Sequence, residues 1–394
     1  MRASTTGFCR VLTKVGKEET DQRLKATLVL EDGTVFKGVG FGAEKVVVGE
    51  VVFTTGMVGY HESLTDPSYR GQILCFTYPL IGNYGVPSYS LLDEYGLPRF
   101  FESWRIQALG IIIHELCLKP SHWRAEKTLN QWLAEEGVPG IYGVDTRMLT
   151  KKLRVKGVMM GALAVSRDEV PLDVLLESIS KTPNYGEVNF VAEVSPKEDK
   201  VYGSSDEVVV LIDCGVKLSI IRSLLNRGFR VVSVPYNTSY EHVMSYNPLG
   251  VVISNGPGDP KQCMDTVNTV RKLFDADVPM LGICLGNQIL ALALGGDTYK
   301  LKYGHRGQNK PCINLETNRC YVTSQNHGYA VNAESLKGTG LRVWWLNADD
   351  KTVEGIKHEE KPCMAVQFHP EATPGPLDCT FIFDQFAQMV RGYA

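Results

Sequence analysis

Residues 278–294 read VPMLGICLGNQILALAL, and this stretch decides the fold class of the chain. The apolar run Val278–Ile283 has the length and composition of a strand that is buried on both faces. A cysteine between two glycines follows, and residues 287–294 then have the composition of a helix. A buried strand that turns tightly into a helix is the repeating unit of α/β folds with a parallel sheet.

The sequence before this stretch repeats the same unit. Apolar, β-branched runs predict strands at 208–212, 229–234 and 250–253. Helical patterns lie between them at 217–227 and 263–275. The alternation predicts a doubly wound, mostly parallel sheet of the flavodoxin-like kind, whose active site lies at the carboxyl ends of the strands.

The first half of the chain has a different pattern. Strands are expected at 26–31 and 34–39, joined by a hairpin turn at Asp32-Gly33, and at 46–54. Helices are expected at 125–136 and 147–155, and proline and glycine mark many loops. We therefore predict four segments: a loose extension (1–25), an N-terminal mixed β/α domain (26–195), a polar linker (196–206) and the α/β domain (207–394).

Composition excludes several classes of protein. The 394 residues are 44% hydrophobic and 22% charged, and the net charge of -3 gives no general attraction to nucleic acid or membrane. No apolar run is long enough to span a bilayer. None of the ten cysteines forms a C-x-x-C pair, so neither a zinc site nor a disulfide framework is expected. The absence of a secretory h-region favours a cytoplasmic location.

The glycine-flanked cysteine is the first candidate for chemistry. In Gly282-Ile283-Cys284-Leu285-Gly286 the nucleophile would lie on a strained turn from strand to helix. The positive end of the helix dipole favours a thiolate there, and free backbone amides can stabilise an oxyanion. A lone cysteine is more often a small buried residue, but its position between the glycines at a strand end favours a nucleophile.

A base for this nucleophile is expected in Phe368-His369-Pro370-Glu371, which follows a strand at 364–368. His369 would transfer protons and Glu371 would fix its tautomer. His327, in the segment 324–329 after another predicted strand, is a competing base that lacks an acidic neighbour. The loop 254–260 contains two glycines and two prolines, and it suits an oxyanion hole built from a peptide N–H.

No Walker A loop and no dinucleotide fingerprint is present, so no nucleotide site is expected. These motifs, in this order, resemble the class I (triad) glutamine amidotransferases over residues 206–390. Over about 26–390 the chain resembles, more narrowly, the small subunits of carbamoyl-phosphate synthase. The motifs that carry the narrower resemblance are Gly56–Tyr60, Leu64–Tyr69, Tyr78–Gly85, Gly143–Thr150 and Tyr303–Pro311.

The resemblance implies an activity and a set of roles. Cys284 would attack the amide carbon of glutamine and release ammonia through a thioester, with His369 and Glu371 completing the triad. The backbone amides of Gly256 and Leu285 would form the oxyanion hole. The remaining glutamine contacts would come from Gly56, which would close over the substrate, and from Gly258, Gln288, Asn326, Gly328 and Tyr329.

The resemblance also implies a partner. A separate large subunit would take up the ammonia and use ATP, Mg²⁺ and bicarbonate to make carbamoyl phosphate for arginine and pyrimidine synthesis. This chain would itself hold no cofactor and no metal, and it would bind L-glutamine and the large subunit as a heterodimer. The domain 26–195 would dock on that subunit.

One position departs from the family pattern, because Asn287 stands where histidine is usual before Gln288. That histidine is not the general base, so activity is expected to survive. Two alternatives stay open: a scaffold subunit with a silent glutaminase site, which only Asn287 supports, and an amidotransferase of another synthetase. The region 26–195 argues against the second alternative, since such chains resemble only the second half.

Overall fold

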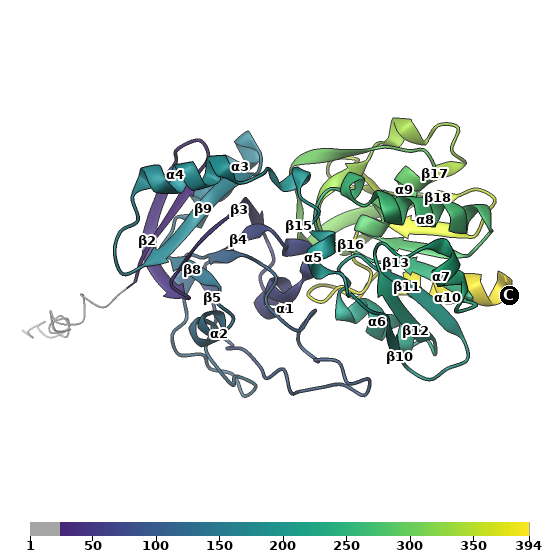
Figure 1. The fold of residues 1–394 in the computed structure, drawn as a ribbon, viewed down its shortest axis with the longest axis horizontal. Helices are drawn as coiled ribbons and strands as arrows, with labels where there is room; N and C mark the ends of the chain where they lie inside the picture. The colour runs from purple at the N-terminus through teal and green to yellow at the C-terminus, as the bar shows by residue number, and fades with distance from the viewer. Residues whose placement is uncertain (1–23, 394) are drawn as a thin grey trace, which may run out of the picture.

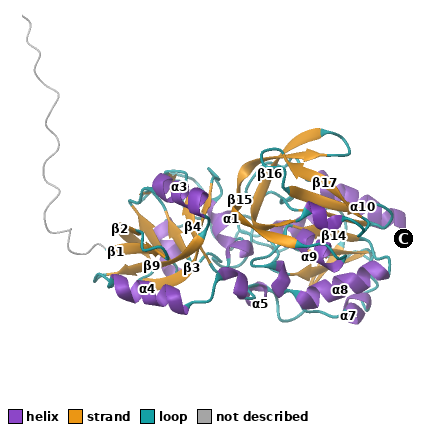
Figure 2. Cartoon of the chain, turned by 90° about the horizontal axis from the view of Figure 1, so that it is seen from above, coloured by secondary structure: helices purple, strands orange, loops and turns teal. Residues whose placement is uncertain are grey.

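A computed structural model describes residues 24–393, which form two parts that lie side by side (Figure 1). The view from above in Figure 2 shows the same separation into a smaller part with the N-terminal strands and a larger part with the C-terminal helices. The predicted extension 1–25 lies outside the described residues except for its last two, and Lys25 already begins β1.

Seven strands of the first part close into a barrel in the order β1-β2-β8-β6-β4-β3-β9. The neighbours β3–β4, β4–β6 and β6–β8 pair in parallel, and the other four pairings are antiparallel. The three predicted strands and the hairpin are confirmed; the closure into a barrel was not predicted. The strands are β1 (Lys25–Leu30), β2 (Val35–Gly42), β3 (Lys45–Thr54), β4 (Gln72–Phe76), β6 (Gly110–Ile112), β8 (Pro139–Tyr142) and β9 (Met159–Ser166).

Short helices and a small sheet surround this barrel. Helix α2 begins with a capping box between Thr128 and Gln131, and α4 packs on β9 and β1. Both predicted helices are present. The helices are α1 (Tyr60–Thr65), α2 (Leu129–Glu135), α3 (Thr146–Lys156), α4 (Leu172–Lys181) and α5 (Val191–Val194), and the small sheet pairs β5 (Leu80–Ile81) with β7 (Glu115–Leu116).

The second part is built on a ten-stranded sheet in the order β10-β12-β11-β13-β14-β19-β18-β17-β15-β16. The five strands from β12 to β19 pair in parallel, as predicted, and the other pairings are antiparallel. Its strands are β10 (Lys200–Tyr202), β11 (Val208–Asp213), β12 (Arg230–Pro235), β13 (Gly250–Ile253), β14 (Met280–Ile283), β15 (Thr298–Asn314), β16 (Arg319–Val331), β17 (Leu341–Asn347), β18 (Val353–His358) and β19 (Cys363–Val366).

Helices cover both faces of the parallel strands, which is the doubly wound arrangement. Alternate residues of β11 divide between the two faces: Val210 packs with α7, α8 and α9, whereas Leu211 packs with α6 and α10. Burial on both faces explains why these strands are continuously apolar. The helices are α6 (Leu218–Leu225), α7 (Tyr240–Met244), α8 (Met264–Asp275), α9 (Leu285–Ala293) and α10 (Phe381–Tyr393).

The two parts share a polar boundary at which strand β15 contacts β3 and α3. Lys300 pairs with Glu50 at 2.7 Å, and Asn326 donates to Asp66 at 2.8 Å. The predicted linker 196–206 contains β10, which adds an antiparallel edge strand to the second sheet. The segment is polar because an edge strand faces solvent, and that polarity is what made it resemble a linker.

Nine cysteines lie within the described residues, and all nine are free thiols. Between residues 24 and 393, none of the helices combines the length and apolar character that a membrane crossing requires.

Candidate active site

Cys284 lies at the tip of the turn from β14 to α9, as the sequence predicts. Its backbone has φ 55° and ψ −102°, a strained conformation for a residue with a side chain, and its N–H donates to the Val366 carbonyl at 2.8 Å. The two flanking positions have no room for a side chain, so both must be glycine. A Cβ atom on Gly282 would lie 2.6 Å from the Gly286 carbonyl oxygen, and one on Gly286 would lie 2.1 Å from that of Ile253.

His369 and Glu371 form the predicted pair. His369 Nδ1 and Glu371 Oε1 are 2.6 Å apart, and both side chains are buried. The backbone N–H of His369 donates to the Ser324 carbonyl at 2.9 Å, and this bond holds the histidine beside β16. His369 Nε2 has no hydrogen-bond partner in residues 24–393, and Cys284 is one of the groups that raise the pKa of this imidazole.

The charges in this pair depend on a third residue, Lys217, which the sequence reasoning missed. Its buried ammonium lies 2.9 Å from Glu371 Oε1 and also donates to the Ala372 carbonyl at 2.5 Å. Burial raises the pKa of Glu371, but Lys217 and His369 outweigh it and lower that pKa to about 2. Burial lowers the pKa of His369, but Glu371 outweighs it and raises that pKa to about 10. The sequence did contain a signal for this residue, because a lysine among apolar residues just after strand β11 indicates a buried charge that needs a partner.

A pocket lined by Cys284 lies at the boundary between the two parts. Seven of the predicted substrate contacts line it together with the nucleophile: Gly256, Gly258, Leu285, Gln288, Asn326, Gly328 and Tyr329. Several residues that sequence reasoning missed also line it, notably Ser68, Glu50, Lys300 and Arg306. Ser68 Oγ accepts a hydrogen bond from Asn255 Nδ2 at 2.9 Å, so this N-terminal residue is fixed beside the loop of Gly256.

Gly56 is the predicted contact that does not line this pocket. Its N–H donates to Thr54 Oγ1 at 3.2 Å, and a Cβ atom placed on it would lie 2.7 Å from Gln308 Nε2. The Gln308 amide also donates to the Val58 carbonyl at 2.6 Å, so a side chain of β15 covers the glycine.

Leu285 and Gly256, the residues predicted to supply an oxyanion hole, line the pocket together with Cys284. Leu285 is the first residue of α9, where an amide has no partner within the helix. Gly256 packs against it so closely that a Cβ atom would lie 2.2 Å from the Cys214 carbonyl oxygen and 2.8 Å from Leu285 Cδ2. The absence of a side chain at 256 therefore allows its backbone to approach the reacting atoms.

Asn287 belongs to a buried amide network beside the nucleophile. Gln367 Oε1 accepts hydrogen bonds from Asn287 Nδ2 and Gln288 Nε2, each at 3.1 Å. Because both amides point at this oxygen, the NH₂ group of Gln367 is turned toward Cys284, whose Sγ lies 3.6 Å from Nε2. Asn287 thus supplies the amide donor that orients Gln367, and Gln367 is a further residue that the sequence did not reveal.

The segment 324–329 differs from the prediction, because it lies within β16 and not after a strand. Strand β16 pairs with β15 across irregularities between Lys300 and His305 and between Gly307 and Lys310. These bulges interrupt the alternation of apolar and polar residues that identifies a strand. His327 Nδ1 bonds the Tyr329 carbonyl at 2.8 Å, and burial, with His305 nearby, keeps its pKa well below the usual value. This environment favours His369 over His327 as the base.

The geometry defines a class of protein: a cysteine hydrolase of the triad type on a doubly wound α/β domain. A family model of class-I glutamine amidotransferases matches residues 210–389, and one of the carbamoyl-phosphate synthase small chain, CPSase domain, matches residues 28–163. The chain belongs to the family of carbamoyl phosphate synthase small chains, with which it shares both domains and about half of its residues.

Several relatives named carbamoyl phosphate synthase small chain match this chain, and three of them show the extent of the match. The protein of Pyrococcus furiosus is 53% identical over 93% of this chain and 98% of its own length. The protein of Methanopyrus kandleri is 50% identical over 93% of this chain and 99% of its own length. The protein of Sulfolobus acidocaldarius is 49% identical over 93% of this chain and 96% of its own length. The likeness therefore extends over both parts of the fold.

Proposed function

We propose that this chain hydrolyses L-glutamine to glutamate and ammonia and delivers the ammonia to a large synthetase subunit. The observation that carries the proposal is the buried chain of contacts from Lys217 through Glu371 to His369, whose pKa is also raised by Cys284 in the lining of the pocket. Such a chain holds an imidazolium next to a thiol, and this favours the thiolate that attacks an amide.

The reaction follows from the positions of these groups. The thiolate of Cys284 attacks the amide carbon of glutamine, and the amides of Gly256 and Leu285 stabilise the oxyanion that forms. The His369 imidazolium gives its proton to the amide nitrogen, which leaves as ammonia when the C–N bond breaks. A water molecule, deprotonated by His369, then attacks the thioester, and glutamate and the thiolate are regenerated.

The polar wall of the pocket suits an amino-acid head group. Glu50 offers a buried carboxylate for an ammonium group, and Arg306, whose Nε has no partner in the described part of the chain, offers a cation for a carboxylate. Gln288 donates to the Tyr329 carbonyl at 2.9 Å, which fixes this side of the pocket before a substrate binds.

The partner is the large carbamoyl phosphate synthase subunit, and the region 26–195 is the docking half. We infer that ATP and Mg²⁺ act on that subunit, that catalysis by this chain needs no cofactor, and that the heterodimer supplies carbamoyl phosphate for arginine and pyrimidine synthesis in the cytoplasm. The family membership of both domains and the pocket between the two parts support this assignment. The match of residues 28–163 weighs against an amidotransferase of another synthetase.

A glutaminase assay with and without the large subunit tests the proposal. Glutamate release should require Cys284 and should be much faster in the complex. The variant Cys284→Ser should lose glutamine use but keep ammonia-dependent synthesis in the complex, because a hydroxyl is the weaker nucleophile. No glutamate release in either state would instead establish the silent scaffold.

A further inference from the structure

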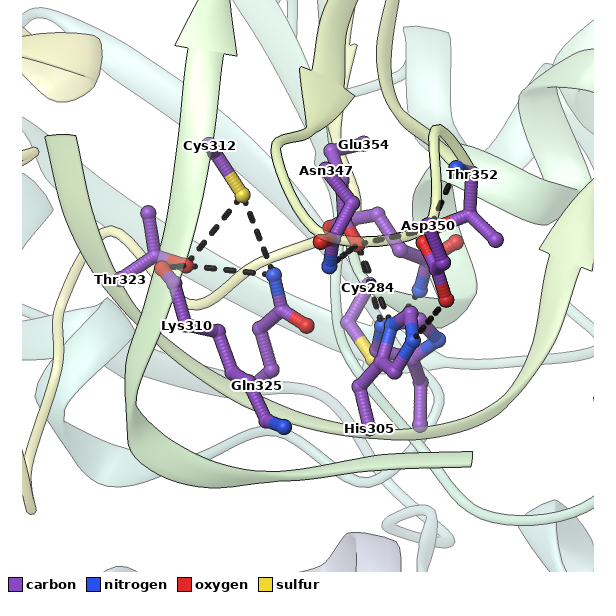
Figure 3. A network of polar contacts seen from close by, with 12 residues as sticks. Cys284, His305, Lys310, Cys312, Thr323, Gln325, Asn347, Asp350, Thr352 and Glu354 are labelled. Atoms are coloured by element: carbon purple, nitrogen blue, oxygen red, sulfur yellow. Dashed lines mark hydrogen bonds and ion pairs between the residues drawn. The ribbon is translucent and has the colours of Figure 1, made fainter. Parts of the chain in front are cut away.

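A buried cluster of three potential metal ligands lies beside the pocket and has no part in the reaction described above. His305 of β15, His327 of β16 and Glu354 of β18 come from three strands, and their ligand atoms all lie within 4.8 Å of one another. The side chains are almost fully buried, with 7%, 5% and 0% of the residue surface exposed. Figure 3 shows His305 and Glu354 in this network near Cys284.

The outer hydrogen bonds fix which nitrogens face the centre of the cluster. His327 Nδ1 lies 2.8 Å from the Tyr329 carbonyl oxygen, which can only accept, so Nδ1 carries the proton and Nε2 has a lone pair. His305 Nε2 lies 2.8 Å from Asp350 Oδ2 and donates to this carboxylate in the same way. In its neutral form, which a bound cation would require, His305 also turns a lone pair on Nδ1 toward the centre.

Three electron-pair donors therefore converge. Glu354 Oε1 lies 3.3 Å from His305 Nδ1 and 3.8 Å from His327 Nε2. His305 Nδ1, His327 Nε2 and Glu354 Oε2 are buried and lack a hydrogen-bond partner among residues 24–393. A single proton between His305 and Glu354 would satisfy that pair, but it would leave His327 Nε2 facing a carboxylate without a donor. A cation satisfies all three groups at once.

We propose that His305, His327 and Glu354 bind one divalent transition-metal cation of the zinc class. Tetrahedral bonds of about 2.0–2.1 Å place ligand atoms roughly 3.3–3.5 Å apart. The separation of 3.3 Å matches this value, whereas that of 3.8 Å requires a small closing movement of His327 or Glu354. Two imidazole ligands favour zinc or its transition-metal analogues over magnesium and calcium, which prefer all-oxygen sites. The cysteine spacing gave no indication of this site, because its ligands are histidine and glutamate on three separate strands.

The surrounding contacts are those of a supported metal site. Asp350 and the Tyr329 carbonyl hold the outer nitrogens of the two histidines, and Asn347 Nδ2 donates to Glu354 Oε1 at 3.2 Å. A bound cation would tie β15, β16 and β18 together directly beside the pocket. With three protein ligands it would keep an open fourth position, and it would hold these strands without taking part in the proposed reaction, whose nucleophile and base come from other positions.

Titration of the full chain with metal alone tests this proposal independently of glutamine chemistry. The chain is first stripped with a chelator and then titrated with Co²⁺ without oxygen. We expect one equivalent of Co²⁺ to produce visible d–d bands without the charge-transfer band of a thiolate ligand. Added Zn²⁺ should displace the Co²⁺ and raise the Tm of the chain. Elemental analysis should give one bound Zn²⁺ per chain.

Variants separate this site from adventitious binding. Glu354→Gln and His305→Gln should each weaken the affinity at least tenfold, whereas His242→Gln, at an exposed histidine paired with Asp199 at 2.7 Å, should leave it unchanged. If a variant fails to fold, the Co²⁺ titration of the unmodified chain still decides the test. No stoichiometric Co²⁺ binding by that chain, or binding retained in both cluster variants, would overturn the proposal, whatever the glutaminase assay shows.

Discussion

Replacement of Lys217 by methionine should weaken both the fold and the proposed catalysis. The ammonium lies 2.9 Å from Glu371 Oε1, and the two side chains are only 3% and 0% exposed. At an effective dielectric of about 20, charges at that distance attract by roughly 6 kcal/mol, which desolvation partly offsets. Breaking a buried pair from one side costs about 3–5 kcal/mol, because the remaining charge stays buried. Methionine keeps most of the volume, so the loss is chiefly electrostatic.

Urea unfolding of the variant and of the unmodified chain measures this loss. Lys181→Met is a matched control, since Lys181 and Glu177 form an exposed pair on one helix and should contribute about 0.5 kcal/mol at most. Lys217 holds the pKa of Glu371 down, to about 2, so the stability from this carboxylate is complete above its unfolded pKa and disappears as the pH falls toward 2. In the variant the folded-state pKa of Glu371 is higher, so this acid loss should be smaller and should end at a higher pH.

The glutaminase rate provides the second measurement. With Lys217 gone, Glu371 loses the ammonium that fixes its position, and the pKa of His369 rises further because Lys217 no longer lowers it. The imidazolium is then a poorer acid, and kcat/KM should fall at least tenfold at neutral pH. A Lys217→Met chain that loses less than about 1 kcal/mol, and that hydrolyses glutamine as fast as the Lys181→Met control, would refute this account of the buried charge.

Three further predictions concern the turn that carries Cys284 and the residues around it. Gln367→Leu should lower kcat/KM and slow the alkylation of Cys284 by iodoacetamide, whereas rates identical to those of the unmodified chain would rule out the role of the amide. Gly256→Ala should lower kcat more than it changes KM, because the added methyl group meets the Cys214 carbonyl and displaces an oxyanion donor; unchanged kinetics would exclude that donor. The pKa of His369 is raised to about 10, so its stabilising contribution is complete below pH 6.5 and is lost as the pH rises through 10. Urea unfolding between pH 6.5 and 10 should show that decline in the unmodified chain, and its persistence in His369→Gln would contradict the assignment.

The sequence predicted the α/β domain well because its signals are local. Strands buried on both faces are continuously apolar, and the glycines around Cys284 identify a turn that only the strand-to-helix geometry requires. His369 and Glu371 are two residues apart, so their contact could be inferred from the motif itself. These features gave the candidate nucleophile, the candidate base and the parallel strands without reference to distant parts of the chain.

What the sequence could not reveal depends on contacts between distant segments. Lys217 and Glu371 are separated by 154 positions, and Ser68 and Asn255 by 187, so no local pattern connects them. The barrel closes through the pairing of β1 with β9. Gly56 fits the family motif, yet Gln308 from the other part of the molecule covers it. Each of these features is determined by tertiary packing.

Trapping of the covalent intermediate tests the central claim most directly. The complex with the large subunit is mixed with labelled glutamine during turnover, quenched in acid and digested. The account predicts one glutamyl group, held as a thioester, on the peptide that contains Cys284, and none in the Cys284→Ser variant. Turnover of glutamine without label on that peptide, or with label on another cysteine, would contradict it.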